Sequence, residues 1–439
     1  MASKNKRFNI LLYCNKPEEN QNAGTVVDHI DAFSKYSRNN IMVWSSLSGL
    51  PDQATIEAMD CIVIHYTLSL LYENYIPRES FQRIRDFKGL KVLFIQDEYR
   101  RVNFVCERIN SIGIDVIFSC APTGVAKQIY RSVDKNTKIL STLTGYVPED
   151  LISFSPIPMA ERKIDVGYRA RKCAYFLGRK SYEKYEIGSL FLNRARETTL
   201  RCDISSQEKD RIYGSKWIDF IANCKTTLGT ESGASLIDFT GRVEYELNRW
   251  QAFHPFASFE EVPPKYLEED GKIDLQVISP RCFEAAALGT VMVMYPGEYS
   301  GLLSPGVHYI SLEKDFSNFD DVMGKIKDHT YLEEVARNAH ADLVEKLNFS
   351  YKKFINNFDE EMLNIASSKE WEPIGADATF VRKEKKLEDV KKSISSKLTD
   401  RMHFYRRFIW KHLPLWFKFL LSVTLLRKWV YFHLFREES

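Results

Sequence analysis

Short, almost entirely apolar runs alternate with amphipathic segments along most of this chain, and this alternation restricts the possible folds more than any other feature. In the first third, the apolar runs fall at 8–14, 40–44, 61–66, 91–96, 115–120 and 138–143, with helical patterns at 25–37 and 80–87. Strands without polar alternation are buried on both faces, as they are in a parallel sheet covered by helices. The pattern therefore predicts a doubly wound parallel α/β domain.

A proline-containing stretch at 150–163 interrupts the pattern and marks a domain boundary. Beyond it, strands are expected at 163–170, 220–229, 274–278, 291–295 and 308–312, and helices at 181–199, 319–328 and 331–346. We therefore expect two parallel α/β domains, over 1–155 and 160–348, and a crossover helix at 349–368 that packs back on the first domain. Two such sheets that face each other leave a cleft, and ligands bind there beyond the carboxyl ends of the strands.

Charge is distributed unevenly along the chain. The 439 residues carry a formal net charge of +2, but from Ser367 onward there are 16 Lys and Arg against 9 Asp and Glu. The rest of the chain is mildly acidic. Enzymes that act on nucleic acids more often spread basic surface over the body, so we expect no nucleic-acid partner.

The tail over 369–439 is predicted to be a helical, basic-aromatic extension that associates with a membrane. Residues 413–426 are mostly apolar but include Pro414 and Lys418, and this run is shorter than the roughly 20 residues that span a bilayer. Cations and aromatic rings flank it on both sides, as in segments that lie in a membrane interface. A partner-docking or oligomerisation helix, or a last core helix, is the alternative for 401–439.

The eight cysteines are scattered without a CxxC pair, and no secretory signal is visible at the N-terminus. Such cysteine usage suits reduced thiols. Together with the tail, it predicts a cytoplasmic protein held peripherally at the inner face of the membrane.

One carboxylate interrupts an alanine-rich helix expected at 280–288. Ser279 suits the N-cap, Pro280 the first helical position and Gly289 the residue past the end. A buried strand is expected directly afterwards, so the helix that carries Glu284 is pressed against a sheet. Arg281 and Leu288 share its face by their spacing, and that face offers an acceptor, a cation and an apolar patch.

Two segments, IYGSKWIDFIANCKTTLGTESGASLIDFTG (212–241) and PRCFEAAALGTVMVMYPGEYSGLLSPGVHYISLEKDFSN (280–318), resemble GT-B glycosyltransferases of the spore-maturation-type and glycosyl transferase group 1 family. The resemblance covers the second domain well, the first domain at the level of the fold, and the tail not at all. It implies two Rossmann-like domains that face a cleft, with a nucleotide-sugar donor on the second and a glycan or lipid-linked acceptor on the first. It also implies that Glu284 binds the ribose hydroxyls of the donor. Another Glu commonly stands eight residues upstream in this family; here that residue is Gln276, which leaves retaining or inverting stereochemistry open.

Basic residues and a glycine-rich turn are expected around the donor diphosphate. Arg169 and Arg171 lie at the end of the strand near 163–170, and Arg281 lies beside Glu284. Arg179 and Lys184 resemble the arginine and lysine that related enzymes aim at the phosphates. The turn PGEYSGLLSPG (296–306) follows a buried strand, so its backbone N–H groups are placed to bind an anion. The candidates in this turn are Gly297, Tyr299, Ser300 and Gly301. A solvated surface charge, or an ordinary surface loop, is the alternative for each of these residues.

Acidic and histidine side chains near strand ends are the candidate catalytic groups. His65 lies at the end of one expected strand, and Asp97 and Glu98 follow another; an acceptor and a catalytic base meet at such ends. Glu231, or Asp238, in the loop 228–241 is a candidate to orient sugar hydroxyls, with turn or helix capping as the alternative. No acidic pair suits a metal site, and the resemblance implies that no metal or other cofactor is required.

Together with these patterns, the resemblance implies a hexosyltransferase that moves a sugar from a nucleoside-diphosphate sugar to a lipid-linked or surface-polysaccharide acceptor, such as a lipopolysaccharide of the cell envelope. Two alternatives stay open. One is a non-catalytic scaffold of the same fold in a membrane polysaccharide-assembly complex. The other is a nucleotide-sugar epimerase, whose soluble substrate would not need the tail.

Overall fold

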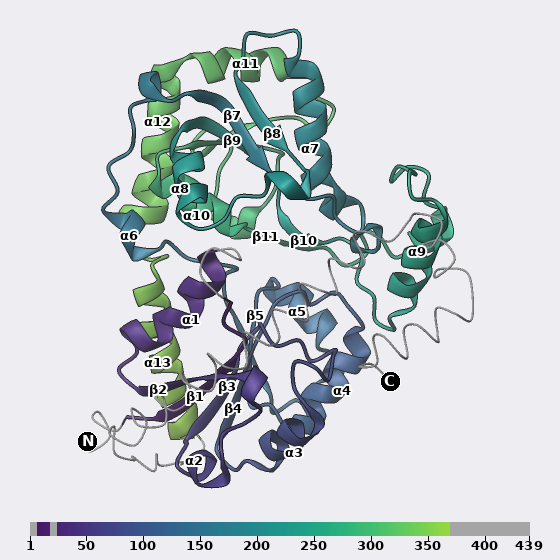
Figure 1. Ribbon diagram of the computed structural model, residues 1–439, viewed down its shortest axis with the longest axis vertical. Helices are drawn as coiled ribbons and strands as arrows, with labels where there is room; N and C mark the ends of the chain where they lie inside the picture. The colour runs from purple at the N-terminus through teal and green to yellow at the C-terminus, as the bar shows by residue number, and fades with distance from the viewer. Residues whose placement is uncertain (1–6, 18–23, 369–439) are drawn as a thin grey trace.

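The computed structural model describes residues 7–17 and 24–368. The first domain is built on a six-stranded, wholly parallel sheet in the order β2-β1-β3-β4-β5-β6 (Figure 1). Its strands are β1 (Asn9–Cys14), β2 (Asn40–Ser45), β3 (Cys61–Ile64), β4 (Leu90–Ile95), β5 (Val116–Ser119) and β6 (Lys138–Ser141). Each strand falls on one of the predicted apolar runs.

Helices cover both faces of this sheet. Successive residues of β1 alternate between the faces, so Ile10 and Leu12 lie in one core and Leu11 and Tyr13 in the other. Helices α1 (Gly24–Tyr36) and α13 (Tyr351–Ser368) pack on the first core. The second core is covered by α2 (Gln53–Glu57), α3 (Arg78–Asp86), α4 (Val102–Ile112) and α5 (Thr123–Ile129).

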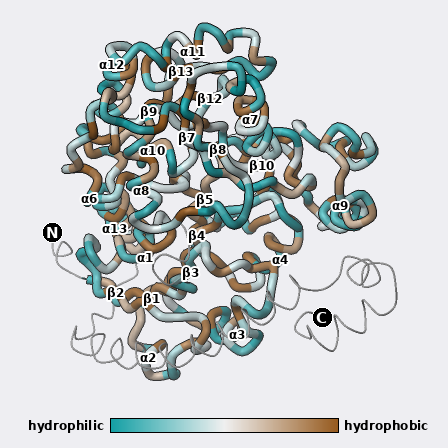
Figure 2. Tube along the Cα trace, turned by 45° about the horizontal axis from the view of Figure 1, so that its top comes forward, coloured by the Kyte–Doolittle hydropathy of each residue, from teal (hydrophilic) through white to brown (hydrophobic). Residues whose placement is uncertain are grey.

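The second domain has a five-stranded parallel sheet in the order β13-β12-β9-β7-β8. Its strands are β7 (Ile164–Arg169), β8 (Cys202–Ser205), β9 (Cys224–Gly229), β12 (Val291–Met294) and β13 (Tyr309–Ser311). One face is covered by α7 (Arg179–Ala195), α11 (Phe319–Lys327) and α12 (His329–His340), and the other by α8 (Ser215–Ala222), α10 (Pro280–Ala287) and the π-helix η7 (Ala341–Glu345). Figure 2 shows the apolar residues gathered along the strands and the inward sides of these helices. The predicted pair of doubly wound domains is confirmed.

Both sheets share one topological feature that positions the site. In each sheet, the first strand along the chain lies between the second and the third strands. The strand order therefore reverses direction beside the first strand, at β1/β3 in one sheet and at β7/β9 in the other. Open parallel sheets bind ligands beyond the carboxyl ends of the strands at this switch point. The ends concerned are Cys14, Ile64, Arg169 and Gly229.

The structure differs from the expectations for the second domain at three places. The segment 220–229 is only partly a strand, because the apolar residues of 215–222 follow a helical period and form α8. The segment 274–278 forms β11 (Leu275–Val277), which pairs antiparallel with β10 (Ser232–Ala234) outside the main sheet. Strand β8 was missed because its short sequence, CDIS, contains no apolar run.

A loop of the second domain packs directly on the first. The backbone N–H groups of Val102 and Asn103, at the start of α4, donate to the carbonyls of Asp238 and Phe239 (3.0 and 2.9 Å). Asp238 N donates in turn to the Tyr99 carbonyl (2.8 Å). Because the first N–H groups of a helix lack partners within it, the loop caps α4 across the domain boundary.

Helix α13 returns the chain to the first domain, where it lies against α1 (Figure 1). Its buried Asp359 accepts hydrogen bonds from Ser37 Oγ, Arg38 N and Asn39 Nδ2 (2.7, 2.8 and 2.8 Å). These contacts fix the helix to the turn between α1 and β2.

The predicted membrane-associating tail over 369–439 lies outside the described residues. Within the residues that are described, no helix is both long enough and apolar enough to cross a bilayer.

Candidate functional site

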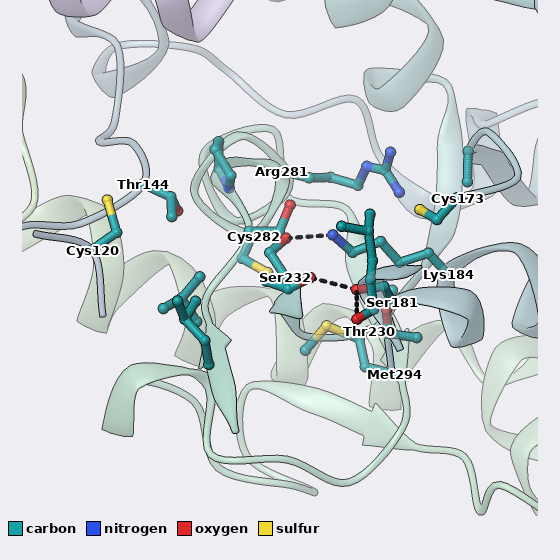
Figure 3. A pocket seen from close by; sticks show the side chains of 18 of the residues that line it. Cys120, Thr144, Cys173, Ser181, Lys184, Thr230, Ser232, Arg281, Cys282 and Met294 are labelled. Carbon is teal, nitrogen blue, oxygen red and sulfur yellow. Dashed lines mark hydrogen bonds between the residues drawn. The ribbon is translucent and has the colours of Figure 1, made fainter. Parts of the chain in front are cut away.

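Two adjoining cavities lie between the domains, at the strand ends named above. The first, the Glu284 cavity, has a volume of about 540 Å³ and runs from the start of α1 to Glu284 on α10. The second, the Lys184 cavity, has a volume of about 370 Å³ and runs from Asp97 to Lys184 (Figure 3). Arg171 and Arg281 line both, so the two cavities form one continuous site.

Glu284 is held in place on the wall of its cavity. Ser279 has the extended backbone of an N-cap, Pro280 occupies the first turn of α10, and Gly289 adopts a positive φ of 62° just past its end. Trp217 Nε1, on α8, donates to Glu284 Oε2 at 2.8 Å. Burial raises the pKa of Glu284, while the bond from Trp217 and the charge of Arg281 lower it. The carboxylate is thus fixed by one donor, and its other oxygen is placed to accept from a ligand hydroxyl.

Arg281 joins the two cavities. Its guanidinium donates to the Arg169 carbonyl at 2.7 Å and lies 4.9 Å from the Tyr168 ring centre and 5.2 Å from that of Trp217. Its Nε is buried and finds no hydrogen-bond partner among the described residues. A buried donor without a partner is costly, so a ligand oxygen at this point would be stabilised.

Lys184 and Arg171 add two more cations. Lys184 Nζ donates to Ser232 Oγ at 3.1 Å, as Figure 3 shows. Burial lowers the pKa of Lys184, and the charges of Arg281 and Arg171 also lower it. In the described part of the chain, neither Lys184 nor Arg171 forms an ion pair with a carboxylate. Three cations that line one cavity favour the binding of an anion between them.

Asp97 faces these cations from the first domain. It is exposed, has a positive φ of 57°, and accepts a hydrogen bond from Tyr99 OH at 2.6 Å. It lines both the Lys184 cavity and a smaller cavity of about 210 Å³ in the first domain, the Tyr72 cavity. Asp97 therefore stands where the anion site and the smaller cavity meet.

His65, predicted as a catalytic base, does not reach the site. Its side chain is fully buried on the sheet face covered by α1, where Nε2 lies 2.9 Å from His29 Nδ1 and Nδ1 accepts from Thr67 N at 3.2 Å. Burial lowers the pKa of His65. Alternation along the strand turns His65 inward, and the next residue, Tyr66, lines the cleft instead.

Glu98 and Glu231 make hydrogen bonds within the protein, although Glu98 lines the Lys184 cavity and the Tyr72 cavity. Glu98 accepts from Ser119 Oγ (2.5 Å), Cys120 N (2.8 Å), Ala121 N (3.2 Å) and the hydroxyl of Tyr130. Glu231 lines neither cleft cavity and accepts from Tyr299 N at 2.8 Å. Both carboxylates satisfy backbone donors that loops would otherwise leave unpaired.

Asp238 caps a helix, which was the predicted alternative to a role in orienting sugar hydroxyls. One of its oxygens accepts from Thr240 N and Gly241 N, and the other from Glu244 N at 2.8 Å. It therefore caps the start of α9 (Arg242–Phe253).

The turn predicted to bind the diphosphate also makes hydrogen bonds within the protein. The backbone N–H of Tyr299 is bound by Glu231, and its ring is buried with its hydroxyl on the Tyr295 carbonyl (2.6 Å). Ser300 Oγ accepts from Ile278 N (3.1 Å), and Gly301 N donates to the Glu298 carbonyl (2.7 Å). None of Gly297, Tyr299, Ser300 and Gly301 lines a cleft cavity.

Two of the arginines predicted to bind the donor diphosphate bind groups of their own domain instead. Arg169 lines the Glu284 cavity, but its guanidinium donates to Asp203 Oδ1 (2.8 Å) and to three backbone carbonyls. Arg179 forms ion pairs with Glu186 and Glu260 (2.6 and 2.9 Å) and lines neither cavity. Their charges are neutralised by their own domain. Leu288, expected as an apolar patch beside Glu284, is buried in the core.

Sequence reasoning missed several residues of the site. Trp217 lies within the segment 212–241 that resembles glycosyltransferases, but no pattern distinguished it from a core residue. Ser205 is the last residue of β8, the strand that was missed, and Gln207 follows it. Gln276 lies in β11 and lines neither cleft cavity. In the described ranges there is no group of three or more His, Cys, Asp or Glu that could hold a metal ion.

No family model matches the chain, and no curated protein sequence matches it. Among solved structures, an alpha-glucosyltransferase in complex with UDP-glucose and DNA containing an abasic site aligns over 82% of this chain and 100% of its own, with 12% identity and a TM-score of 0.49. Anabaena HepE in complex with UDP-glucose aligns over 82% and 100%, with 11% identity and a TM-score of 0.47. TarM aligns over 68% of this chain and 53% of its own, with 12% identity and a TM-score of 0.42.

Proposed function

We propose that this protein is a glycosyltransferase that transfers a sugar from a nucleoside-diphosphate sugar to a hydroxyl group of an acceptor. The observation that carries the proposal is the arrangement of Glu284, Arg281, Lys184 and Arg171 along one cleft. A carboxylate held by Trp217 suits the vicinal hydroxyls of a ribose, because charge-assisted hydrogen bonds of this kind are strong. The three cations suit the diphosphate beside it.

The same cations suit the leaving group. During transfer, the acceptor oxygen bonds to the anomeric carbon while the bond from that carbon to the diphosphate oxygen breaks. The electron pair stays on the diphosphate, whose negative charge increases. Preorganised cations stabilise such charge where it develops. We therefore also propose that no metal ion is needed, and that turnover persists in EDTA.

Asp97 is the catalytic base in this proposal. It lies between the anion site and the Tyr72 cavity, which would hold the acceptor, and it would take the proton of the attacking hydroxyl. This role belongs to an inverting reaction. In a retaining reaction the departing diphosphate takes the proton, so Asp97→Asn would then keep most of its turnover.

The acceptor we propose is a lipid-linked or surface polysaccharide at the cytoplasmic face of a membrane. Support comes from the basic and aromatic composition of 401–439. Liposome flotation at low and high salt tests this part: the full chain should float with anionic vesicles, and a chain ending at residue 400 should not. Failure of the full chain to float would remove the membrane from the proposal.

The main experiment is a thermal-shift screen with UDP, GDP, ADP and CMP, followed by assays of hydrolysis and transfer with the matching nucleotide sugar. Binding of one nucleotide, with slow hydrolysis of its sugar conjugate, is expected. Binding without turnover would favour the non-catalytic scaffold, and turnover to an isomeric nucleotide sugar would favour the epimerase. No binding to any nucleotide would contradict the proposed site.

A further inference from the structure

Arginine side chains stack on phenylalanine rings along one side of the first domain, where Figure 1 shows α3, α4 and α5 together. Arg101, Phe104 and Arg108 follow one another at three- and four-residue spacing, so they share one side of α4. The guanidinium carbon of Arg101 lies 4.6 Å from the centre of the Phe104 ring, and that of Arg108 lies 5.5 Å from the same centre. Arg108 also lies 4.3 Å from the ring centre of Phe81, on α3.

The same arrangement continues onto a loop of the second domain. The guanidinium carbon of Arg131, just after α5, lies 4.6 Å from the ring centre of Phe239. The carbonyl of Phe239 accepts from Asn103 N at 2.9 Å, which places Phe239 beside the start of α4. We call this surface the arginine strip; it comprises Arg101, Arg108 and Arg131 with the rings of Phe81, Phe104 and Phe239. None of these residues lines the cleft cavities.

The guanidinium groups of the strip do not use their N–H groups within the described part of the protein. There, none of the three arginines forms a hydrogen bond or an ion pair, and Arg108 Nε is buried without a partner. Burial lowers the pKa of Arg108, and the charge of Glu73 raises it. A guanidinium stacked on a ring still presents the N–H groups along its edge, which can bind both oxygens of a carboxylate or phosphate. Three such groups along one strip favour a ligand that carries several anionic groups.

The rings of the strip are already engaged by the protein. Phe81 and Phe239 pack against the core of the first domain, and Phe104 lies beside two guanidinium groups. Single-stranded nucleic acids bind by stacking their bases on free aromatic rings, so the strip offers them contacts to the phosphates alone. It favours a chain that binds through its anionic groups and needs no ring.

We propose that the arginine strip binds the carboxylates or phosphates of an acidic acceptor glycan. The proposal rests on the proposed function, which supplies the acceptor and its place in the Tyr72 cavity. Val102 and Val105 line that cavity from the buried side of α4, and Arg100, the neighbour of Arg101, also lines it. A glycan whose end lies in the cavity therefore has the strip beside it, on the same helix.

Arginine-selective labelling of the full chain with p-hydroxyphenylglyoxal, measured by mass spectrometry at each arginine, tests the proposal. Hexagalacturonate and inorganic polyphosphate supply the carboxylates and the phosphates, and maltohexaose is the neutral comparison. Poly(dT) and hexaglutamate represent nucleic acid and acidic protein. At physiological salt, hexagalacturonate or polyphosphate should slow the labelling of Arg101 and Arg131 by about fivefold or more. The labelling of Arg194, which is exposed on α7, should not change.

Arg108→Lys tests whether the strip acts as one site. This variant keeps the positive charge but removes the planar fork of N–H groups. It should reduce the protection of Arg101 and Arg131 by about fivefold, whereas the matched control Arg194→Lys should leave that protection unchanged.

Three results would overturn the proposal: no protection by hexagalacturonate or polyphosphate, protection at least as strong by poly(dT), hexaglutamate or maltohexaose, or full protection in Arg108→Lys. Labelling of Arg171 in the presence of UDP, GDP, ADP or CMP reports on the cleft separately. Protection of the strip by an acidic probe, without protection of Arg171 by any nucleotide, would contradict the proposed function and keep the strip as a binding site for acidic glycans. Protection of Arg171 alone would keep the proposed function and remove the strip.

Discussion

At the scale of single residues, the carboxylates near the cleft differ in how many hydrogen bonds they already accept from the protein. Glu284 has one protein donor, Trp217, whereas Glu98 has four and Glu231 is bound to the backbone of Tyr299. A carboxylate whose lone pairs are taken by protein donors cannot also bind a ligand without leaving those donors unpaired. Glu284 and the exposed Asp97 are therefore the acids on which the proposed chemistry depends.

Glu284→Ala should weaken nucleotide binding and leave the fold intact, because Ala is a good helix former and its neighbours on α10 are already Ala. The loss of a charge-assisted pair of hydrogen bonds should cost on the order of 1.5–3 kcal/mol. Trp217→Phe keeps an aromatic ring but removes the donor, so a smaller loss is expected. Isothermal titration calorimetry with the nucleotide found in the screen measures both. Glu333→Ala, on the exposed face of α12, is the matched control. Equal affinities in all three variants would mean that Glu284 does not contact the nucleotide.

Glu98 should make stability depend on pH. Burial raises its pKa from the usual 4.5 to about 7, against the hydrogen bonds from Ser119, Tyr130, Cys120 and Ala121. Between these two values the folded state keeps a proton that the unfolded state has lost, so the free energy of unfolding falls as pH rises from about 4.5 to about 7. The fall due to Glu98 should be on the order of 1–3 kcal/mol.

Glu98→Gln cannot titrate, so this part of the slope should disappear, although the variant is expected to be less stable at each pH. Urea denaturation at several pH values measures the slope. Asp28, whose pKa is raised to about 6 by burial and by Glu284, titrates in both proteins and cancels in the comparison. An unchanged slope would show that Glu98 is ionised throughout.

At the scale of elements, α13 connects the end of the second domain to the first domain and packs against it. Its apolar face, with Phe354, Ile355, Phe358 and Met362, completes the core between β1, β3 and α1. Asp359, which is 1% exposed, is the charged anchor in that face, and the hydroxyl of Tyr351 donates to the Thr25 carbonyl at 3.2 Å. Apolar burial supplies most of the attachment, and Asp359 fixes its register.

Asp359→Ala should leave three donors, on Ser37, Arg38 and Asn39, without their acceptor. A loss of about 2–4 kcal/mol in the free energy of unfolding is expected, since buried donors to a charged group are costly to leave unpaired. Asp359→Asn, which keeps one acceptor oxygen, should recover part of it. Hydrogen exchange of α1 and α13 shows whether the effect is local. Lys353→Ala, at an exposed position of the same helix, should change little.

At the scale of the whole molecule, the loop 236–241 and the pair Arg100–Glu244 join the two domains beside the cleft. Arg100 Nε donates to Glu244 Oε2 at 3.0 Å, and both side chains are largely shielded, at 26% and 15% exposed. The same arginine donates to Tyr72 OH at 2.6 Å on the wall of the Tyr72 cavity. The shape of the proposed acceptor cavity thus depends on how the domains are held together.

Removal of this ion pair should loosen the domains without unfolding either. Arg100→Ala and Glu244→Ala should each increase the radius of gyration measured by small-angle X-ray scattering, and the double variant should add little. A double-mutant cycle in urea should give a coupling free energy of about 1 kcal/mol, as expected of a partly shielded pair. The pair Arg242–Glu246, on the surface of α9 within one domain, is the control. Scattering curves that match the wild type would mean that the backbone bonds of the loop suffice.

The sequence by itself determined the two doubly wound domains, since uninterrupted apolar runs between amphipathic segments can be buried only in covered parallel sheets. It also placed Glu284, Arg281, Lys184, Arg171 and Asp97 on the elements whose ends meet at the cleft. The tertiary structure determined which of the polar side chains near the cleft can still bind a ligand. Whether a polar side chain at a strand end is free depends on donors far away in the chain, as for Glu231 and Tyr299, or Arg169 and Asp203. Sequence spacing specifies which face of an element a residue occupies, but only the packed structure decides whether another residue has already used its hydrogen bonds.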